Sequence, residues 1–403
     1  MRDPLALRHG RDHEQPSHWG SAAVPGAPER APTYDRENRF FQEDFDELRD
    51  IGYLSIAVPE ELGGAGASLA EVCQLQRRLA YYAGPSALAV NMHLYWTGVA
   101  ADLWRAGDTS LQWLLEEAVD GEVFAAGHAE TGNDIPVLLS TTRAEPADGG
   151  YRFTGRKAFG SLGPAWTQLG IHGLDTSDPE HPRVVHAFAP RDSAGLSTVE
   201  TWDDVLGMRA TRSDDTVLDG VFVPEERIAR VVDAGFPGID AFVLGIFVWA
   251  LLPFGNIYFA IAHRMFDLTV ERLEKKTSIA MSRDMRHHPG VQHDVAAMAL
   301  ELEAVEPHLD RIAADWSRGV DHGAVWPVKI FAAKSHAVEA SWRVVDRALD
   351  VAGGFGIFPG SGLERLFRDA RLGRIHPANR YVTHEVLGKA LLGVDLADER
   401  RWG

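Results

Sequence analysis

The sequence contains one cysteine, Cys73, among its 403 residues. A single thiol can form neither an intrachain disulfide nor a cysteine-rich zinc site, and we expect Cys73 to be a small buried group in a helix. The histidines lack the spacing of metal ligands on one helical face, so the sequence predicts no metal site. His287 and His288 precede a proline, which is typical of a solvated loop before a helix.

Basic residues are scarce as well. The chain has 40 lysines and arginines against 58 acidic residues, which gives a formal net charge of −18. An acidic surface repels nucleic acid and anionic membranes, and no basic tract reverses this locally. We therefore expect a small molecule, rather than a nucleic acid or a membrane, as the binding partner.

Long apolar runs are almost absent. Residues 1–10 contain no apolar core of a secretion signal, so we expect a cytoplasmic protein. One run, at residues 239–262, approaches the length that crosses a bilayer, but it contains Asp240, Pro253 and Asn256. A helix that is apolar on all sides also suits the centre of a helical bundle, and we favour that interpretation over a membrane span.

Apolar residues make up 45% of the chain, enough for a large core and for two or three domains. The pattern is irregular at first, then helical, then strand-like with turns between short runs, and finally helical again. The predicted fold class is therefore mostly α with a central β domain. The predicted boundaries are an N-terminal extension at 1–35, a helical domain at 36–121, a central β domain at 122–235 and a helical bundle at 236–403.

Periodicity also predicts individual elements within these parts. Helices are expected at residues 70–82, 103–119, 295–314 and 332–351. Strands are expected at residues 123–126, 151–154, 184–189 and 216–223. Asp148, Gly149 and Gly150 have the composition of a hairpin turn just before the second of these strands.

Five short motifs occur in an order that resembles the acyl-CoA dehydrogenase superfamily. They are GYLSIAVPEELGG at 52–64, GHAETGND at 127–134, GRKAFGS at 155–161, LGMRATRSDDTVLDGVFVP at 206–224 and AGGFGIFPGSGLERLFRD at 352–369. The resemblance covers roughly residues 40–395. It implies an N-terminal helical domain, a β-barrel-like middle domain and a C-terminal four-helix bundle, with a flavin between the last two. It also implies a homotetramer whose subunits share flavin sites.

The resemblance assigns the flavin ring to two segments of the β domain. A planar isoalloxazine needs an apolar wall and hydrogen bonds along its polar edges. Phe159 offers a wall, Gly160 lets the backbone come close and Ser161 offers a hydroxyl donor. The other contacts that the resemblance implies here are Gly127, His128, Gly132, Asn133 and Trp166. For Trp166, an ordinary core position is the alternative.

The far end of the cofactor site departs from the family pattern. The family usually has an arginine that pairs with the pyrophosphate, and this chain has Lys276 in the nearest stretch. Asp350 replaces a family glutamine near the adenylate, while Gly353 and Gly354 remain. Asn379 is a further implied contact. Because these changes weaken binding of the adenine dinucleotide part of FAD, FMN becomes possible as well. The cofactor is therefore expected to be FAD or FMN.

The family's catalytic glutamate is missing. An acyl-CoA dehydrogenase needs a carboxylate held over its substrate. The two positions that supply it in the family match Pro377 and Phe242 here, and neither side chain accepts a proton. Asp240 is the alternative, as a base moved from its usual place.

His376 stands where a related branch, the flavin-dependent monooxygenases such as dibenzothiophene monooxygenase, has a histidine. Members of that branch take reduced flavin from a separate reductase and form a C4a-hydroperoxide, which needs hydrogen bonds and a dry pocket. The resemblance implies catalytic roles for His376, Ser161 and His93, because an imidazole can donate to a peroxide and shuttle its proton. Helix capping by His376 and a core position for His93 are the alternatives.

Three hypotheses follow. The favoured one is a monooxygenase that uses reduced flavin and O2 to oxygenate a small apolar or aromatic molecule, with a flavin reductase as a possible partner. The second is a dehydrogenase of an acyl-CoA or acyl-carrier thioester with a relocated base. The third is a non-catalytic family member. The fold alone does not separate them, because one fold supports several chemistries.

Overall fold

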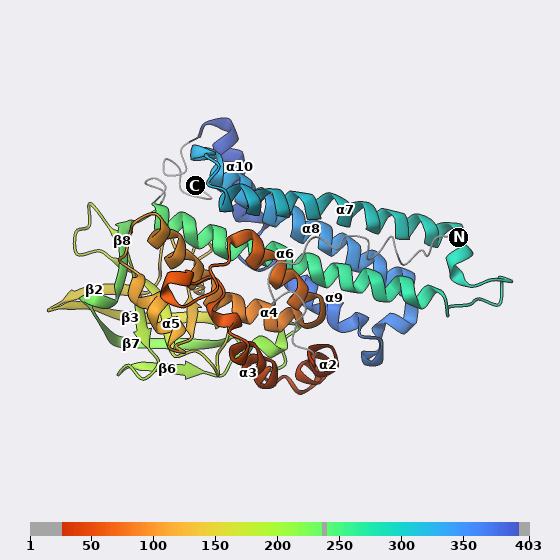
Figure 1. The fold of residues 1–403 in the computed structure, drawn as a ribbon, viewed down its shortest axis with the longest axis horizontal. Coiled ribbons are helices and arrows are strands. Elements are labelled where there is room, and N and C mark those ends of the chain that lie inside the picture. The colour runs from red at the N-terminus through yellow and green to blue at the C-terminus, as the bar shows by residue number, and fades with distance from the viewer. Residues whose placement is uncertain (1–25, 236–239, 395–403) are drawn as a thin grey trace.

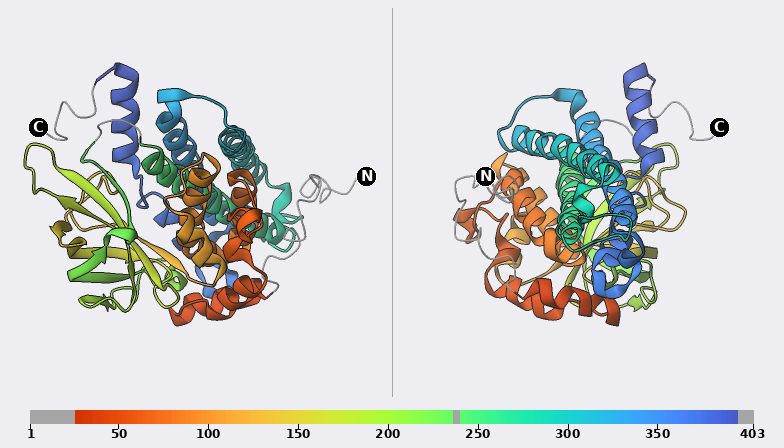
Figure 2. Two further views of the ribbon diagram at one scale, coloured as in Figure 1. Left: turned by 60° about the vertical axis from the view of Figure 1, so that its left-hand side comes forward. Right: turned by 90° about the vertical axis from the view of Figure 1, so that its right-hand side faces the viewer.

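The computed structural model describes residues 26–235 and 240–394. The first part of the predicted extension, residues 1–25, and Ile239 of the apolar run lie outside these ranges. The sheet occupies one end of the molecule, and the long helices run side by side away from it (Figures 1 and 2). The fold is mostly helical with a central sheet, as the sequence predicts.

Four α-helices precede the sheet in the part of the chain that the structure describes. They are α2 (Ala27–Glu37), α3 (Gln42–Asp50), α4 (Leu69–Arg105) and α5 (Gln112–Val119). Ser68 and Glu71 begin α4 with a capping box, in which each side chain binds the backbone N–H of the other residue. α4 contains the predicted helix at 70–82 and continues beyond it through a kink at Ala83.

Two expectations for this region were wrong. Residues 27–35 form most of α2, because Ala27, Ala31 and Tyr34 recur at helical spacing and are buried. Two of these three apolar residues are small alanines, so the sequence signal was weak. The helix expected at 103–119 is divided into the end of α4 and α5 by a turn at Gly107, whose φ is 91°.

In the described part of the chain, the sheet has eight strands. They are β1 (Phe124–Gly127), β2 (Arg143–Ala147), β3 (Gly150–Gly160), β4 (Gln168–Asp175), β5 (Arg183–Pro190), β6 (Leu196–Val199), β7 (Asp214–Pro224) and β8 (Ile228–Asp233). The order is β6-β7-β3-β2-β4-β5-β8, and β1 pairs in parallel with β4. The four predicted strands all form. Gly149, with a φ of 73°, makes the predicted turn between β2 and β3.

The helices after the sheet are α6 (Ala241–Leu273), α7 (Pro289–Ser317), α8 (Trp326–Ala352), α9 (Leu363–Leu372) and α10 (Arg380–Leu392). Among the described helices, α6 alone is long and apolar enough to cross a membrane, but 83% of its most apolar window is buried inside the protein. Helices α4, α7, α8 and α9 pack against it. α6 is therefore the central helix of the bundle, as its composition predicts.

Small residues let α4 and α6 pack closely. Gly98 of α4 faces the indole ring of Trp249, and an added Cβ atom would come within 2.2 Å of that ring. Gly245 of α6 faces Val99 across the same interface, where an added Cβ atom would make an ordinary contact at 3.4 Å. Trp249 is fully buried and donates its ring N–H to Asp102 at 2.6 Å. This packing fixes the helical side of the cavity described below.

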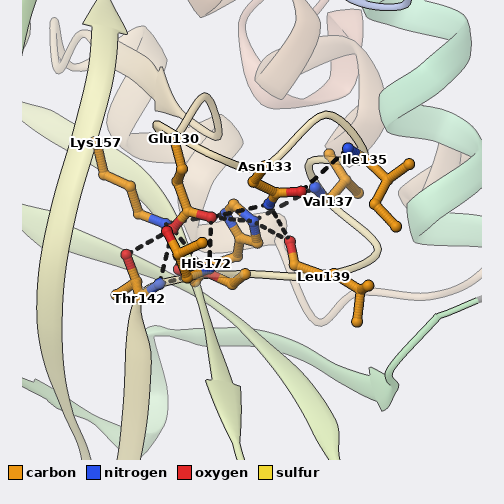
Figure 3. Close-up of polar contacts among 10 residues, drawn as sticks. Glu130, Asn133, Ile135, Val137, Leu139, Thr142, Lys157 and His172 are labelled. Atoms are coloured by element: carbon orange, nitrogen blue, oxygen red, sulfur yellow. Dashed lines mark hydrogen bonds and ion pairs between the residues drawn. The ribbon is translucent and has the colours of Figure 1, made fainter. Parts of the chain in front are cut away.

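A buried ion pair holds the loop between β1 and β2 (Figure 3). Lys157 Nζ lies 2.5 Å from Glu130 Oε1, and both side chains are shielded from solvent. The carboxylate also accepts hydrogen bonds from the Thr142 hydroxyl and the Thr141 backbone. Burial alone would raise the pKa of Glu130, but the Lys157 ammonium and these hydrogen bonds lower it to about 2. The loop that this pair anchors forms part of the cavity wall.

Gly98→Ala is expected to destabilise the protein by about 1–3 kcal/mol, because the added methyl group overpacks the Trp249 ring. Gly245→Ala is the matched control, since it lies in the same interface with room for a methyl group. The higher helix propensity of alanine should make this control neutral or stabilising by up to about 1 kcal/mol. Urea denaturation measures both free energies of unfolding, and equal effects would contradict the close packing at Gly98.

Glu130→Gln is expected to cost about 3–5 kcal/mol at neutral pH, because it leaves the Lys157 ammonium buried without its countercharge. Glu43→Gln is the control. It breaks the solvent-exposed Arg39–Glu43 pair and should cost less than about 1 kcal/mol. Because the folded-state pKa of Glu130 lies below its ordinary value, its stabilising effect is lost as the pH falls from 4.5 to about 2. Urea titrations across that range should show a smaller pH dependence for Glu130→Gln than for the wild type.

Candidate active site

A cavity of about 210 Å³ lies between the sheet and helices α4, α6, α8 and α10. Its wall is almost entirely apolar. The contributing side chains include Leu88, Met92, Phe247, Phe254, Phe331 and Val382. Of the described residues that line the cavity, none is a lysine or an arginine, and the single acid is Asp134, an exposed residue. An apolar cavity with a few polar groups is the usual form of a small-molecule site.

His376 lies between α9 and α10 and lines the cavity. Its imidazole packs on the ring of Phe254, with 4.1 Å between the ring centroids. Its Nδ1 atom is buried and has no hydrogen-bond partner in the described part of the chain. Burial, helped by the nearby Lys334 ammonium, lowers the pKa of His376 to about 3. The imidazole is therefore neutral near pH 7, with a ring nitrogen left for a bound molecule.

β3 ends beside the cavity and brings Phe159 to it. The φ of Phe159 is 57°, and its side chain is 58% exposed although it is apolar. An aromatic ring left uncovered at a cavity is a suitable surface for a planar ligand. At Gly160, an added Cβ atom would come within 2.8 Å of Asp214 O, so this position needs glycine for β3 to pair with β7.

Ser161 begins a chain of hydroxyl groups that ends on the backbone. The Thr211 hydroxyl donates to Met208 O at 2.8 Å, so it must accept from Ser213, whose Oγ lies 2.6 Å away. The single hydroxyl proton of Ser213 is then used, so Ser161 donates to Ser213 at 2.8 Å. Ser161 and Ser213 both line the cavity. In this arrangement Ser161 presents an acceptor to a bound molecule, and not the donor that the sequence analysis expected.

Tyr95 and His128 form a second polar group in the cavity wall. The Tyr95 hydroxyl lies 2.9 Å from His128 Nδ1, and both residues line the cavity. His128 Nε2 is buried without a described partner. Burial, with smaller effects from His186 and Lys157, holds the pKa of His128 well below its ordinary value. The pair is therefore uncharged and keeps hydrogen-bonding capacity for a ligand.

Sequence analysis missed Tyr95 and Ser213. Leu88, Met92 and Tyr95 recur at four- and three-residue steps, so they lie on one face of α4. A tyrosine on an otherwise apolar helix face was the sequence signal that could have identified Tyr95. Ser213 meets Ser161 only because β7 pairs with the end of β3, and nothing in the local sequence shows this pairing.

His93 does not line the cavity, which contradicts the role that the resemblance implied for it. Its Nε2 donates to Leu54 O at 2.9 Å, and its Nδ1 accepts the backbone N–H of Phe124 at 3.0 Å. Both ring nitrogens are therefore used. Burial lowers the pKa of His93 to about 4. The alternative interpretation holds: His93 is a neutral core histidine that ties α4 to the segment after Gly52 and to β1.

Five expected ring contacts lie outside the cavity lining: Gly160, described above, and the four residues that follow. Gly127 ends β1 and Gly132 makes a turn with a φ of 80°. Asn133 donates to Glu130 and to a loop carbonyl, so it shapes the loop. Trp166 is buried and stacks under the guanidinium of Arg191, with 4.4 Å between them. These four residues lie behind the cavity wall. Trp166 is an ordinary core residue, which was the alternative interpretation.

Lys276, Gly353 and Gly354 lie far from the cavity within one chain. The Lys276 ammonium donates to the carbonyls of Val351 and Ala352 at 2.7 and 3.2 Å, at the end of α8. Helical rise puts this end about 30 Å from the part of α8 that lines the cavity. A single chain therefore does not bring these three residues to the ring site.

No carboxylate replaces the missing glutamate among the described residues that line the cavity, apart from the exposed Asp134. Pro377 lines the cavity and Phe242 is buried in the core. Asp240, the alternative base, caps α6 by accepting the backbone N–H groups of Phe242 and Val243. In the same way, Asn379 caps α10. Neither cap residue lines the cavity.

The residues at the cavity fit the ring of a flavin. The uncovered Phe159 ring, the Ser161 hydroxyl and the unpartnered Nδ1 of His376 together offer an apolar surface and hydrogen-bonding groups. The lining has no cation for a diphosphate, so it fits the ring better than the far end of FAD. Over residues 26–235 and 240–394, no three His, Cys, Asp or Glu side chains form a group that could hold a metal ion.

Comparison with known proteins agrees with this geometry. Residues 25–112 match the acyl-CoA dehydrogenase N-terminal domain, and residues 254–381 match the acyl-CoA dehydrogenase C-terminal domain. The chain is 29% identical to the putative acyl-CoA dehydrogenase YdbM of Bacillus subtilis, over 88% of this chain and 91% of the relative. It is 30% identical to the amino sugar nitrososynthase DnmZ of Streptomyces peucetius, over 92% and 91%. Dibenzothiophene monooxygenase of Mycolicibacterium goodii is 26% identical, over 85% and 86%.

Solved structures show the same fold. KijD3, in complex with FMN and a dTDP-linked amino keto sugar, superposes with a TM-score of 0.82 at 24% identity, over 94% of this chain and 93% of that one. TdsC from Paenibacillus sp. A11-2, in complex with FMN and indole, has a TM-score of 0.76 at 20% identity, over 92% and 95%. Taken with the two matched domains, these likenesses show that the chain belongs to the acyl-CoA dehydrogenase superfamily of flavin-dependent enzymes.

Proposed function

We propose that this protein is a flavin-dependent monooxygenase that inserts one oxygen atom of O2 into a small apolar or aromatic molecule. Two electrons come from reduced flavin, and the second oxygen atom leaves as water. One observation carries the proposal: His376, a neutral imidazole, lines the cavity where a dehydrogenase needs a carboxylate. The single acid of the described lining, Asp134, is exposed rather than buried over the site.

A bound reduced flavin supplies the electrons that activate O2. The apolar side chains of α4, α6 and α8 exclude water from the reacting atoms. His376, neutral and otherwise unpartnered at Nδ1, can donate a hydrogen bond to oxygen in the tautomer that carries its proton on that nitrogen. Ser161 accepts a hydrogen bond, and the Tyr95–His128 pair holds a polar group of the substrate or the ring.

FMN, brought in reduced form by a separate reductase, is the proposed flavin. The structures of KijD3 and TdsC contain FMN. The cavity lining offers no cation for a diphosphate, and Asp350 would repel the phosphates of an adenylate. We also propose a homotetramer, on the family resemblance, in which Lys276, Gly353 and Gly354 of one subunit approach the cofactor of another.

A dehydrogenase of acyl thioesters is the second candidate. The 29% identity to YdbM favours it, and Asp134 would then be the acid nearest to the substrate. An acyl-CoA carries phosphates, however, and the described lining contains no lysine or arginine to receive them. A catalytic base also needs burial over the substrate, which Asp134 lacks.

His376→Ala is expected to weaken FMN binding by no more than about tenfold, the effect of losing one hydrogen bond, and to speed the release of hydrogen peroxide when the reduced FMN complex meets oxygen. The reason is that a hydrogen bond from the imidazole retains the activated oxygen. Removing a side chain that donates to the reacting oxygen typically changes a reaction rate by about 10²-fold or more. Fluorescence titration measures FMN binding, and stopped-flow absorbance with a peroxide assay measures the reaction.

His293→Ala is the control, because His293 is an exposed residue on α7. It should match the wild type in both measurements. With indole as the probe substrate and ¹⁸O2 as the oxidant, the wild type and the control should place label in the product, and His376→Ala should not. Equal peroxide release from all three proteins would exclude His376 from the chemistry.

A further inference from the structure

Lys334 is a buried lysine directly behind the cavity wall. It lies on α8 with 2% of its surface exposed, and it does not line the cavity. A buried ammonium normally has a carboxylate partner, because its desolvation is costly. Lys334 forms no ion pair among the described residues. Glu339, which acts on its charge from a distance, pairs instead with Arg374 at 3.0 Å.

Backbone carbonyl groups take the place of a countercharge. Lys334 Nζ donates to His376 O and Ala378 O, each at 2.8 Å, and to Gly373 O at 3.4 Å. The three N–H donors of an ammonium thus match three acceptors. All three carbonyls belong to the segment that connects α9 to α10, residues 373–379, which carries His376.

Other contacts hold this segment mainly near its two ends. The His376 backbone N–H donates to Leu372 O at 2.8 Å, and the Asn379 side chain caps α10. Two further side-chain hydrogen bonds reach the segment: Arg374 donates to Glu339 of α8 at 3.0 Å, and the Thr383 hydroxyl of α10 donates to Ala378 O at 3.4 Å. Lys334 alone among the described side chains bonds the backbone at three points along the segment. The imidazole itself has an unpartnered Nδ1 and contacts the rings of Phe254 and Tyr258.

We propose that Lys334 is the positioning residue of this active site and that its three carbonyl contacts hold the imidazole of His376 at the cavity wall. The role of His376 in this statement rests on the function proposed above, whereas the contacts of Lys334 do not depend on it. The three hydrogen bonds to carbonyl oxygens offset part of the cost of burying an ammonium without a carboxylate.

Lys334 also places a positive charge behind the imidazole. The titratable groups that the structure puts against His376 are Lys334 of α8 and Tyr258 of α6. Burial raises the pKa of Tyr258 well above its ordinary value, so this phenol stays neutral. Burial lowers the pKa of Lys334 to about 7. Below that pH the ammonium opposes protonation of His376, and its removal should let the imidazole take up a proton more readily.

The test compares Lys334→Met with Lys329→Met. Methionine has a similar volume and no charge, so it fills the space of the buried stem. Lys329 lies on the same helix and is only partly buried, which makes it the matched control. His376 is followed by NMR in protein labelled with ¹³C at histidine Cε1, and its signal among the 17 histidines is assigned with His376→Gln.

In the wild type and in Lys329→Met, the His376 signal should not move between pH 5 and pH 8. When the titration is continued down to pH 3, the His376 midpoint in Lys334→Met should lie about one pH unit or more above that of the wild type, and amide hydrogen exchange in residues 373–379 should accelerate on the order of tenfold. These measurements need no flavin, so they stand even if the proposed function fails. An unmoved midpoint together with unchanged exchange would overturn the proposal.

A second readout tests whether Lys334 acts through His376. Peroxide release from the reduced FMN complex should be as fast in Lys334→Met as in His376→Ala. The double variant should be no faster than either single one, because the two residues act as a unit. Additive effects in the double variant would show that Lys334 acts separately from His376 and would overturn the positioning role. If none of the proteins binds reduced FMN, the proposed function fails, and the NMR and exchange results alone decide the role of Lys334.

Discussion

The cost of burying charge in an apolar cavity is the constraint on which this structure depends. The cavity lies between the sheet and the bundle, and its polar groups are either neutral or paired. His376 and His128 are kept uncharged by burial, and the Lys157–Glu130 pair neutralises its own charges behind the loop wall. Lys334 is the exception, because carbonyl oxygens rather than a carboxylate surround it. The chemistry proposed for the site follows from this neutrality.

Acyl-CoA dehydrogenases remove a substrate proton with a buried carboxylate. A protein of the same fold that lacks this carboxylate can instead support oxygenation of a substrate by O2. The superfamily fold supplies a flavin site, and the residues around the ring select the reaction. In this chain an imidazole, hydroxyl groups and apolar side chains line the cavity, and the two positions that the resemblance matches to the family's glutamate hold Pro377 and Phe242. In the function proposed here, such a lining would protect activated oxygen from water and give it hydrogen bonds, and it would offer no buried base to an acyl thioester.

The sequence predicted most of the fold, because long helices and alternating strands have strong periodic patterns. It missed α2, whose apolar face consists largely of alanines, and it joined α4 to α5 across Gly107. In the site, the resemblance led to Ser161 and His376, which both line the cavity. It failed for His93, whose ring nitrogens are used by the core. Contacts that depend on tertiary pairing, such as those of Ser213 and Lys334, leave no local signal in the sequence.

Among the described residues, no buried carboxylate lines the cavity, so this protein should not oxidise an acyl-CoA. The flavin-loaded protein is mixed with acyl-CoAs of increasing chain length in the absence of oxygen and of any reductant, and the flavin absorbance is followed. The flavin should stay oxidised with every acyl-CoA, although dithionite reduces it in the same cuvette. Bleaching by any acyl-CoA would show that a group in this protein removes the α-proton. The cavity would then contain a catalytic base, and the protein would be a dehydrogenase.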